Sequence, residues 1–440
     1  MRTFGIGAAA LHSAVGFVVA AARETTRLDL EPDAEAALGE RLFAVAAWSC
    51  LVEPGDSVAA SLVRGLGAPR ALEVLVARRT AGQILEELAG TARDTPDAAG
   101  VVDATAIAAG LARWLPRLSE RPVMQALATA RRSGIALVVP GDARWPEQLD
   151  ALGAHAPLCL WTRGDRQALR ADRAIAIVGA RAATSYGEHV AMELGAELTG
   201  RGVVVVSGAA YGIDGVAHRA ALAAGGPTIA VLAGGVDRSY PAGHADLLDR
   251  IAANGAVVSE LPPGAAPTRW RFLQRNRVIA ALSEATVVVE AGARSGSLNT
   301  AAHAATLGRP VGAVPGPVTS AASAGCHRLL REFGAECITS ADDVLELIGG
   351  DGWDGAPPPG SRAEDARVRG ARTSERTDDF TRVMDALSTR TWRTPRDVAA
   401  RAGLSLPDTE ALLGVLALEA RAERDASDER GWRVARDSGS

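Results

Sequence analysis

Six short apolar runs between residues 172 and 348 constrain this 440-residue chain more than any other feature. "AIAIV" leads into "GARAATSYG", "VVVV" into "SGAAYGIDGVAH", "TIAVLA" into "GGVDRSYP", and "TVVVE" into "AGARSGSLNT". "AVVSE" is followed by "LPPG", and "VGAV" by "PGP". Because these β-branched runs alternate with Ala-rich helical segments, the pattern predicts an α/β fold with a parallel sheet.

The glycine-rich segments after these runs predict an anion site. In open parallel sheets, ligands bind at the carboxyl ends of the strands, where the chain leaves for the next helix. Glycine lets backbone N–H groups approach a ligand there, and helix N-termini add partial positive charge. The formal net charge of the chain is −5, so any positive charge at such a site must be a local concentration.

Two common phosphate-binding motifs are missing from the sequence. "GARAATSYG" lacks the G-x-G-x-x-G fingerprint, and G-x-x-x-x-G-K-[ST] cannot occur because the chain has no Lys. "EAGARSGSLNT" also lacks the acid that follows the phosphate loop of ribose–base hydrolases with a similar fold. These absences disfavour an enzyme. The alternative of a nucleotide- or sugar-phosphate-processing enzyme stays open, with Asp214, Glu260 and Glu290 as its nearest candidate groups.

The stretch "RWRFLQRNRVIAALS", residues 269–283, places arginines around Phe272 and Asn276 before it turns apolar. Planar guanidinium groups match phosphate oxygens, and Phe272 either offers a ring face to an unstacked base or packs in the core. Arginines, backbone amides and an aromatic ring in one crevice favour single-stranded nucleic acid over duplex. The arginines at or near expected strand ends are Arg181, Arg275, Arg277 and Arg294.

Seven motifs together resemble the DNA-processing protein A family (DprA, also called Smf). In order they are "VGARAATSYG", "SGAAYGIDGVAHRAAL", "TIAVLAGGVDRSYP", "SELPPG", "QRNRVIAALS", "VVVEAGARSGSLNTA" and "AVPGP", within about residues 135–345. The resemblance implies an extended Rossmann-like, doubly wound, mainly parallel sheet. It implies a homodimer that binds and protects single-stranded DNA and helps load the RecA recombinase, in natural transformation among other settings. It implies neither catalysis nor a cofactor or metal.

Carried over by motif, the resemblance assigns nine residues to the single-stranded DNA site. Arg181 would hold a phosphate at the end of the first strand, and Ser207 and Gly208 would line the crevice with hydroxyl and backbone donors. The opposite wall and the floor would be formed by Phe272, Arg275, Asn276, Arg277, Ser295 and Gly296.

Other residues of these motifs are interpreted as structural. We expect Asp214 to cap the helix that holds His218, and Tyr240-Pro241 to support a turn. The sequence departs from the family pattern at Leu273, where Pro is more usual, and at Ala209, where a larger apolar residue is common. Neither departure removes a proposed contact.

Composition changes divide the chain into five expected parts. The N-terminal extension has an apolar segment that suggests either a signal peptide, an over-extended start or a loosely attached helix. "RGLGAPRAL" is typical of a helix–hairpin–helix turn or of an ordinary corner between two helices. The parts are an uncertain extension (1–35), a helical SAM- or helix–hairpin–helix-like domain (36–132), a Rossmann-like DNA-binding domain (133–348), a linker (349–375) and a winged-helix domain (376–436).

The tail predicts two helices and a two-stranded wing that ends at Trp432, with Thr394 as a helix N-cap and Gly403 at a helix end. Its second helix is acidic, which favours a protein-interaction or regulatory role over insertion into a DNA groove. The four cysteines show neither C-x-x-C spacing nor a paired framework, as expected for a reduced cytoplasmic protein without a membrane span. A structural recombination adaptor with little DNA contact would leave the arginines unexplained.

Overall fold

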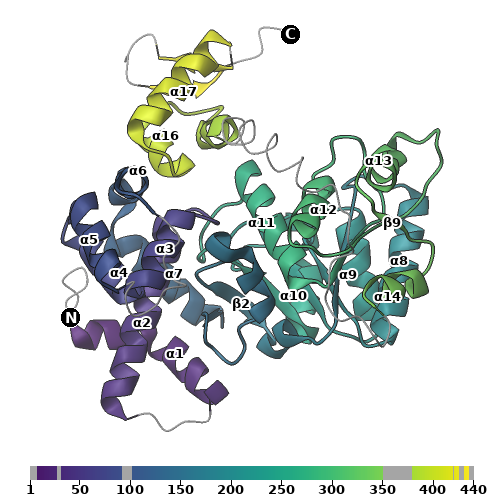
Figure 1. The fold of residues 1–440 in the computed structure, drawn as a ribbon, viewed down its shortest axis with the longest axis horizontal. Coiled ribbons are helices and arrows are strands. Elements are labelled where there is room, and N and C mark those ends of the chain that lie inside the picture. The colour runs from purple at the N-terminus through teal and green to yellow at the C-terminus, as the bar shows by residue number, and fades with distance from the viewer. Residues whose placement is uncertain are drawn as a thin grey trace.

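The six apolar runs all form strands of one sheet (Figure 1). The computed structural model describes residues 7–26, 31–91, 102–349, 379–419, 421–425 and 431–435. The strands of the sheet are β1 (Ala136–Val138), β2 (Leu160–Gly164), β3 (Ala174–Val178), β4 (Val204–Ser207), β5 (Thr228–Val231), β6 (Ala256–Ser259), β7 (Ala285–Val288), β8 (Val311–Ala313) and β9 (Glu336–Cys337).

The helices precede, cover and follow this sheet. They are α1 (Ala8–Thr26), α2 (Pro32–Leu51), α3 (Ser57–Leu66), α4 (Ala68–Val76), α5 (Ala81–Thr91), α6 (Ala104–Trp114), α7 (Glu120–Arg132), α8 (Ser185–Gly200), α9 (Ile213–Ala223), α10 (Ala245–Asn254), α11 (Arg269–Leu282), α12 (Ser297–Thr306), α13 (Ala324–Glu332), α14 (Ala341–Leu347), α16 (Pro395–Ala402) and α17 (Leu406–Leu418), with a further helix at 379–386.

The strand order is β1-β2-β6-β5-β4-β3-β7-β8-β9. All neighbouring strands from β6 to β9 are parallel, whereas β2 is antiparallel to β6 and β1 to β2. The chain passes outward from β3 through β4 and β5 to β6, and α11 then returns it to β7 on the other side of β3. The direction of winding therefore reverses between β3 and β7. The predicted doubly wound, mainly parallel α/β sheet is confirmed.

The strands are apolar on both sides because helices cover both faces of the sheet. In β3, Ala174, Ala176 and Val178 pack with α11, α12 and α13, whereas Ile175 and Ile177 pack with α8, α9 and α14. This alternation follows from the two-residue period of a strand. The two layers hold the carboxyl ends of β3 and β7 at one edge, where their loops meet.

The N-terminal helices form a second core that continues into the sheet. Trp48 of α2 meets Trp114 of α6 edge to face, with ring centroids 5.6 Å apart, and both side chains are buried. The sequence suggested a loosely attached first helix, but α1 buries Leu11, Val15 and Val18 in this core. Residues 1–6 and 27–30 of the predicted extension lie outside the described residues. In the part of the chain that the structure describes, no helix has the length and apolar character needed to span a membrane.

The C-terminal part has its own small core, formed by the helix at 379–386, α16, α17 and the hairpin β10 (Ala422–Arg424) and β11 (Trp432–Val434). The Thr394 side chain accepts a hydrogen bond from the Asp397 amide, and Gly403 ends α16 with φ 66°, so both predicted helix ends are confirmed. The winged-helix assignment stays a prediction. The linker predicted at 349–375 lies outside the described residues except for Gly349.

Candidate nucleic-acid interface

A crevice of about 1080 Å³ opens where the winding of the sheet reverses. One side is formed by residues 178–182, at and after the end of β3, and the floor by residues 292–297, which follow β7. The N-terminal half of α11 forms the other side, and Thr381 and Asp385 of the C-terminal part close one end. Ligands of open α/β sheets bind at this position because loops on the two sides of the reversal leave a gap between them.

Phe272 lies at the centre of a cluster of cations and rings in this crevice. The guanidinium carbon of the exposed Arg181 lies 4.9 Å from the centroid of the half-buried Phe272 ring, and that of Arg275 lies 5.7 Å from it. The exposed ring of Tyr240 lies 5.4 Å away, tilted by 51°. The structure thus brings Arg181 and Phe272 together across the crevice, although they are distant in sequence. Tyr240, which was interpreted only as a turn support, is a lining residue.

Arg275 lines the crevice but is largely buried in its wall rather than free at the surface. Its Nη1 donates hydrogen bonds to the carbonyl oxygens of Val231 and Gly208, at 2.5 and 2.7 Å, and its Nε donates to Oδ1 of Asn276 at 3.1 Å. Burial lowers the pKa of Arg275 to about 10, with the charge of Asp214 opposing the shift. At neutral pH it remains a cation, so it contributes positive potential to the crevice.

Asp214 fixes the loop after β4 instead of capping α9. Its Oδ2 accepts hydrogen bonds from the amides of Gly208 and Ala210, at 3.1 and 3.4 Å. The N-cap position of α9 belongs to Gly212, and its φ of 73° favours glycine, so the predicted capping role is wrong. Burial raises the pKa of Asp214, whereas Arg275 and the loop amides oppose the rise.

His218 has the structural role that we expected. It is fully buried, and its Nδ1 lies 2.8 Å from the Thr228 hydroxyl. Burial lowers the pKa of His218 to about 3, so the ring is neutral at physiological pH. It links α9 to β5 behind the crevice.

Ser207 and Gly208 were expected to line the crevice, and the structure places them behind its lining residues. The Ser207 hydroxyl donates to the carbonyl oxygen of Ile177 at 2.7 Å, so it links β4 to β3. The Gly208 amide donates a hydrogen bond to Asp214, and its carbonyl oxygen accepts one from Arg275. Both residues are buried and neither offers a free donor, so we correct their predicted role to support of the wall.

Arg277 of α11 is directed at Glu260 and not into the crevice. Its side chain is 4% exposed and its Nη2 donates to Oε1 of Glu260 at 2.7 Å. Burial raises the pKa of Glu260, and the charge and hydrogen bond of Arg277 oppose that rise. Arg277 does not line the crevice, and its predicted place in the wall is wrong.

Asn276, Ser295 and Gly296 meet at the floor of the crevice. The Asn276 Nδ2 donates to the carbonyl oxygen of Gly296 and to Oδ1 of Asn299, both at 3.2 Å, which ties α11 to the loop after β7. The Ser295 hydroxyl lies 2.8 Å from that of Ser297. The same loop carries Arg294, an exposed lining residue outside the assigned set.

The crevice thus has a rim of cations and rings above a hydrogen-bonded floor. Arg181, Arg294, Tyr240 and Phe272 present the groups that a nucleic acid strand can contact. Among the described residues, no group of three or more His, Cys, Asp or Glu side chains is placed to hold a metal ion. A doubly wound α/β sheet with a cationic crevice at its point of reversal defines a Rossmann-like anion-binding protein.

The chain belongs to the DprA family. The family model for DNA recombination-mediator protein A matches residues 136–349. The chain is 50% identical over 317 residues to a putative DNA processing protein DprA of Mycobacterium tuberculosis, covering 69% of this chain and 78% of that protein. It is 38% identical over 247 residues to the DNA processing protein DprA of Bacillus subtilis, covering 56% and 81%. The X-ray structure of DprA from Streptococcus pneumoniae aligns with a TM-score of 0.54 and 30% identity, covering 69% of this chain and 95% of that one.

Proposed function

We propose that this chain binds single-stranded DNA in the crevice between β3 and β7. The observation that carries the proposal is the exposed Arg181 guanidinium over the Phe272 ring, 4.9 Å from its centroid. A DNA strand needs cations near its phosphates and ring faces near its bases, and Arg181 and Phe272 offer both side by side. Membership of a family described as DNA recombination mediators supports DNA as the ligand.

The shape of the site favours a single strand over a duplex. A duplex is commonly bound by an exposed helix or ribbon that enters a groove. Here α11 packs against the sheet with the residues from Arg275 to Leu282 buried, so it cannot enter a groove. A crevice with an aromatic ring in one wall instead accepts unpaired bases, which stack on that ring.

The charges of the lining side chains suit phosphate groups. Four arginines line the crevice against two carboxylates, and one of these carboxylates, Asp214, is held by loop amides. The other, Asp385, accepts a hydrogen bond from the Trp270 amide at 3.1 Å. The lining arginines are Arg181, Arg269, Arg275 and Arg294.

We further propose that the site binds DNA without catalysing a reaction. The three carboxylates that an enzyme could use as an acid or a base all have hydrogen-bond or ion-pair partners within the protein. Glu290 accepts hydrogen bonds from the amide and hydroxyl of Thr184, at 2.9 and 2.6 Å, and Glu260 pairs with Arg277. Asp214 is bound by loop amides. Prolonged incubation with oligonucleotides and nucleotides, followed by chromatography, should give no product, and a product would support the enzyme alternative.

RecA loading, a homodimer and a cytoplasmic location are proposals that rest on family membership. RecA loading is tested by strand exchange on single-stranded DNA coated with a single-strand-binding protein, with and without this chain. Sedimentation equilibrium tests the dimer. Cell fractionation tests the location.

Fluorescence anisotropy of labelled oligo-dT, compared with a duplex of equal length at two salt concentrations, tests DNA binding itself. We expect tighter, salt-sensitive binding of the single strand. The double variant Arg181→Ala/Arg294→Ala should weaken binding and reduce the slope of log K against log salt by about 1.4, or about 0.7 per lost phosphate contact. The matched control Arg219→Ala/Arg250→Ala removes two exposed helical arginines that do not line the crevice. Equal affinity of both double variants would contradict the proposed site.

A further inference from the structure

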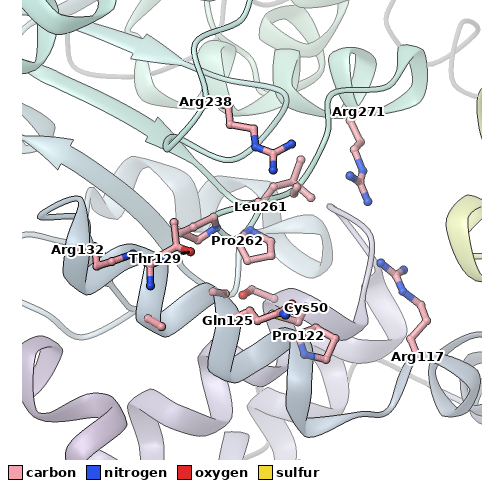
Figure 2. Close-up of a pocket in the computed structure, with 16 residues that line it drawn as sticks. Cys50, Arg117, Pro122, Gln125, Thr129, Arg132, Arg238, Leu261, Pro262 and Arg271 are labelled. Atoms are coloured by element: carbon pink, nitrogen blue, oxygen red, sulfur yellow. Dashed lines mark hydrogen bonds between the residues drawn. The ribbon is translucent and has the colours of Figure 1, made fainter.

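A second hollow, of about 570 Å³, lies between α7 and the loops that follow β5 and β6 (Figure 2). Its lower side is formed by α2 and α7, which contribute Cys50, Gln125 and Thr129. Its upper side is formed by residues 261–265 and Arg238. The hollow therefore lies at the junction of the N-terminal helices with the carboxyl edge of the sheet. We call it the junction recess.

All charged side chains that line the junction recess are arginines: Arg117, Arg132, Arg238 and Arg271. Arg132 and Arg238 are exposed, and the Nε of Arg238 lies 3.7 Å from Oδ2 of its neighbour Asp237. Arg117 and Arg271 share one buried carboxylate, Glu53, at 3.1 and 2.8 Å. Figure 2 shows the Arg117 and Arg271 guanidinium groups approaching each other from opposite sides. One carboxylate between two cations leaves a positive charge there, so the recess suits an anion.

The uncharged lining of the recess indicates which part of a nucleic acid would fit. It contains Gln125, Thr129, prolines and small residues, and no aromatic ring. Without a ring, bases have nothing to stack on, whereas guanidinium groups match phosphate oxygens. The recess is therefore suited to a sugar-phosphate backbone, in contrast to the crevice, where Phe272 and Tyr240 supply rings.

The recess and the crevice are linked by a third hollow of about 760 Å³. This middle hollow shares Arg117, Gly264 and Arg271 with the junction recess. It shares Pro267, Thr268 and Asp385 with the crevice. The three hollows thus follow one another along the carboxyl edge of the sheet, around the start of α11.

We propose that the junction recess is a second phosphate-binding site, which holds the backbone of a single DNA strand after the strand leaves the crevice. This inference rests on the proposed function of the crevice. Arg132 and Arg238 are the exposed cations of the recess, so they make the phosphate contacts that only a longer DNA strand reaches. Arg117 and Arg271 supply positive potential while they remain paired with Glu53.

The test is fluorescence anisotropy of the full chain with oligo-dT of about 4 to about 16 nucleotides, the range of site sizes in single-strand-binding folds. The test variant is Arg132→Ala/Arg238→Ala, which keeps the ion pairs of Glu53 with Arg117 and Arg271. The matched control is Arg121→Ala/Arg131→Ala, because both are exposed α7 residues that do not line the recess. We expect equal affinities for the shortest strands. The wild type and control should gain affinity with length, whereas the test variant should not, and its salt slope for the longest strand should fall by about 1.4.

The other outcomes each overturn the inference, and they separate it from the proposed function. Equal length dependence in the test variant and wild type, with the shortest strands still bound, would exclude the recess and leave the crevice. Failure of every strand to bind the folded wild type would exclude both. A rise in melting temperature with thymidine triphosphate that is lost in the test variant, without a length effect, would show that the recess holds a free nucleotide instead.

Discussion

Glu53 and Arg271, which are 218 residues apart in the sequence, form a bidentate ion pair. The Arg271 Nε and Nη2 donate to the two carboxylate oxygens of Glu53, at 2.9 and 2.8 Å. Both side chains are largely buried, and Arg117 adds a third contact at 3.1 Å. This cluster joins the N-terminal helices to the start of α11, so it positions the wall of the crevice.

Glu53→Gln should lower the free energy of unfolding by about 3–5 kcal/mol, because the substitution leaves buried arginines without their partner. Urea unfolding at neutral pH measures the loss. Glu73→Gln is the control, since it breaks an exposed pair with Arg70, and a loss of at most about 1 kcal/mol is expected. Similar losses for the two variants would show that the Glu53 cluster does not stabilise the junction.

The same cluster predicts a pH dependence of stability. Burial alone would raise the pKa of Glu53, but the charges of Arg271 and Arg117 outweigh burial and lower it from 4.5 to about 2. A lowered folded-state pKa means that this stabilisation is present above about pH 4.5 and is lost as the pH falls towards 2. The stability difference between wild type and Glu53→Gln should therefore be constant near neutral pH and shrink below about pH 4.5. Urea unfolding curves across this range test the sign.

Phe272→Ala and Arg181→Ala should weaken oligo-dT binding in different ways. Loss of the ring removes stacking, worth about 1–3 kcal/mol per base, and should leave the salt slope unchanged. Loss of the cation should reduce the salt slope by about 0.7. Anisotropy titrations at several salt concentrations separate the two effects. A change of slope in the Phe272 variant would contradict its role as a stacking face.

Gly208→Ala should destabilise the chain by about 1–3 kcal/mol. A Cβ at this position would lie 2.2 Å from Nη1 of Arg275, a group held by two carbonyl oxygens. Gly296→Ala is the matched control in the same crevice, because its Cβ would meet no atom within 4 Å. Thermal unfolding compares the two, and equal melting temperatures would mean that Arg275 can move without cost.

Arg277→Met should destabilise the fold while the folded protein keeps its affinity for short oligo-dT. The substitution leaves Glu260 buried without a partner, and such losses cost about 3–5 kcal/mol. Replacing Glu260 by Gln in the same chain should restore part of the stability, because the unpaired acid is then removed. A lower affinity in the folded Arg277 variant would return this residue to the DNA site.

The strands and the place of the crevice could be predicted because both depend on local patterns. β-Branched runs followed by glycine mark buried parallel strands and their carboxyl ends, and β3 has the residues of the "AIAIV" run. The separate roles of Arg275 and Arg277 were missed although the sequence contained a signal. Residues two apart on a helix do not face the same side, so the two arginines could not share one wall.

Other features depend on contacts that a linear pattern does not contain. Ser207 ends β4 and Gly208 follows it, but their hydrogen-bond partners, Ile177 and Arg275, are set by strand order and by the packing of α11. The junction recess is lined by Arg132 and Arg238, which come from the two sides of the boundary between the N-terminal helices and the sheet. Neighbouring residues in the sequence do not predict that arrangement.

The walls of the crevice come from widely separated parts of the chain, among them residues 178–182, Tyr240, the start of α11, residues 292–297, and Thr381 with Asp385. The site therefore exists only when the sheet, α11 and the C-terminal part have assembled. A ligand that binds only this assembled form stabilises it by RT ln(1 + [L]/Kd). Binding of a ligand in the crevice is thus thermodynamically coupled to the stability of the assembled chain. A bound strand would protect remote segments from proteolysis and amide exchange as well as the residues that it touches.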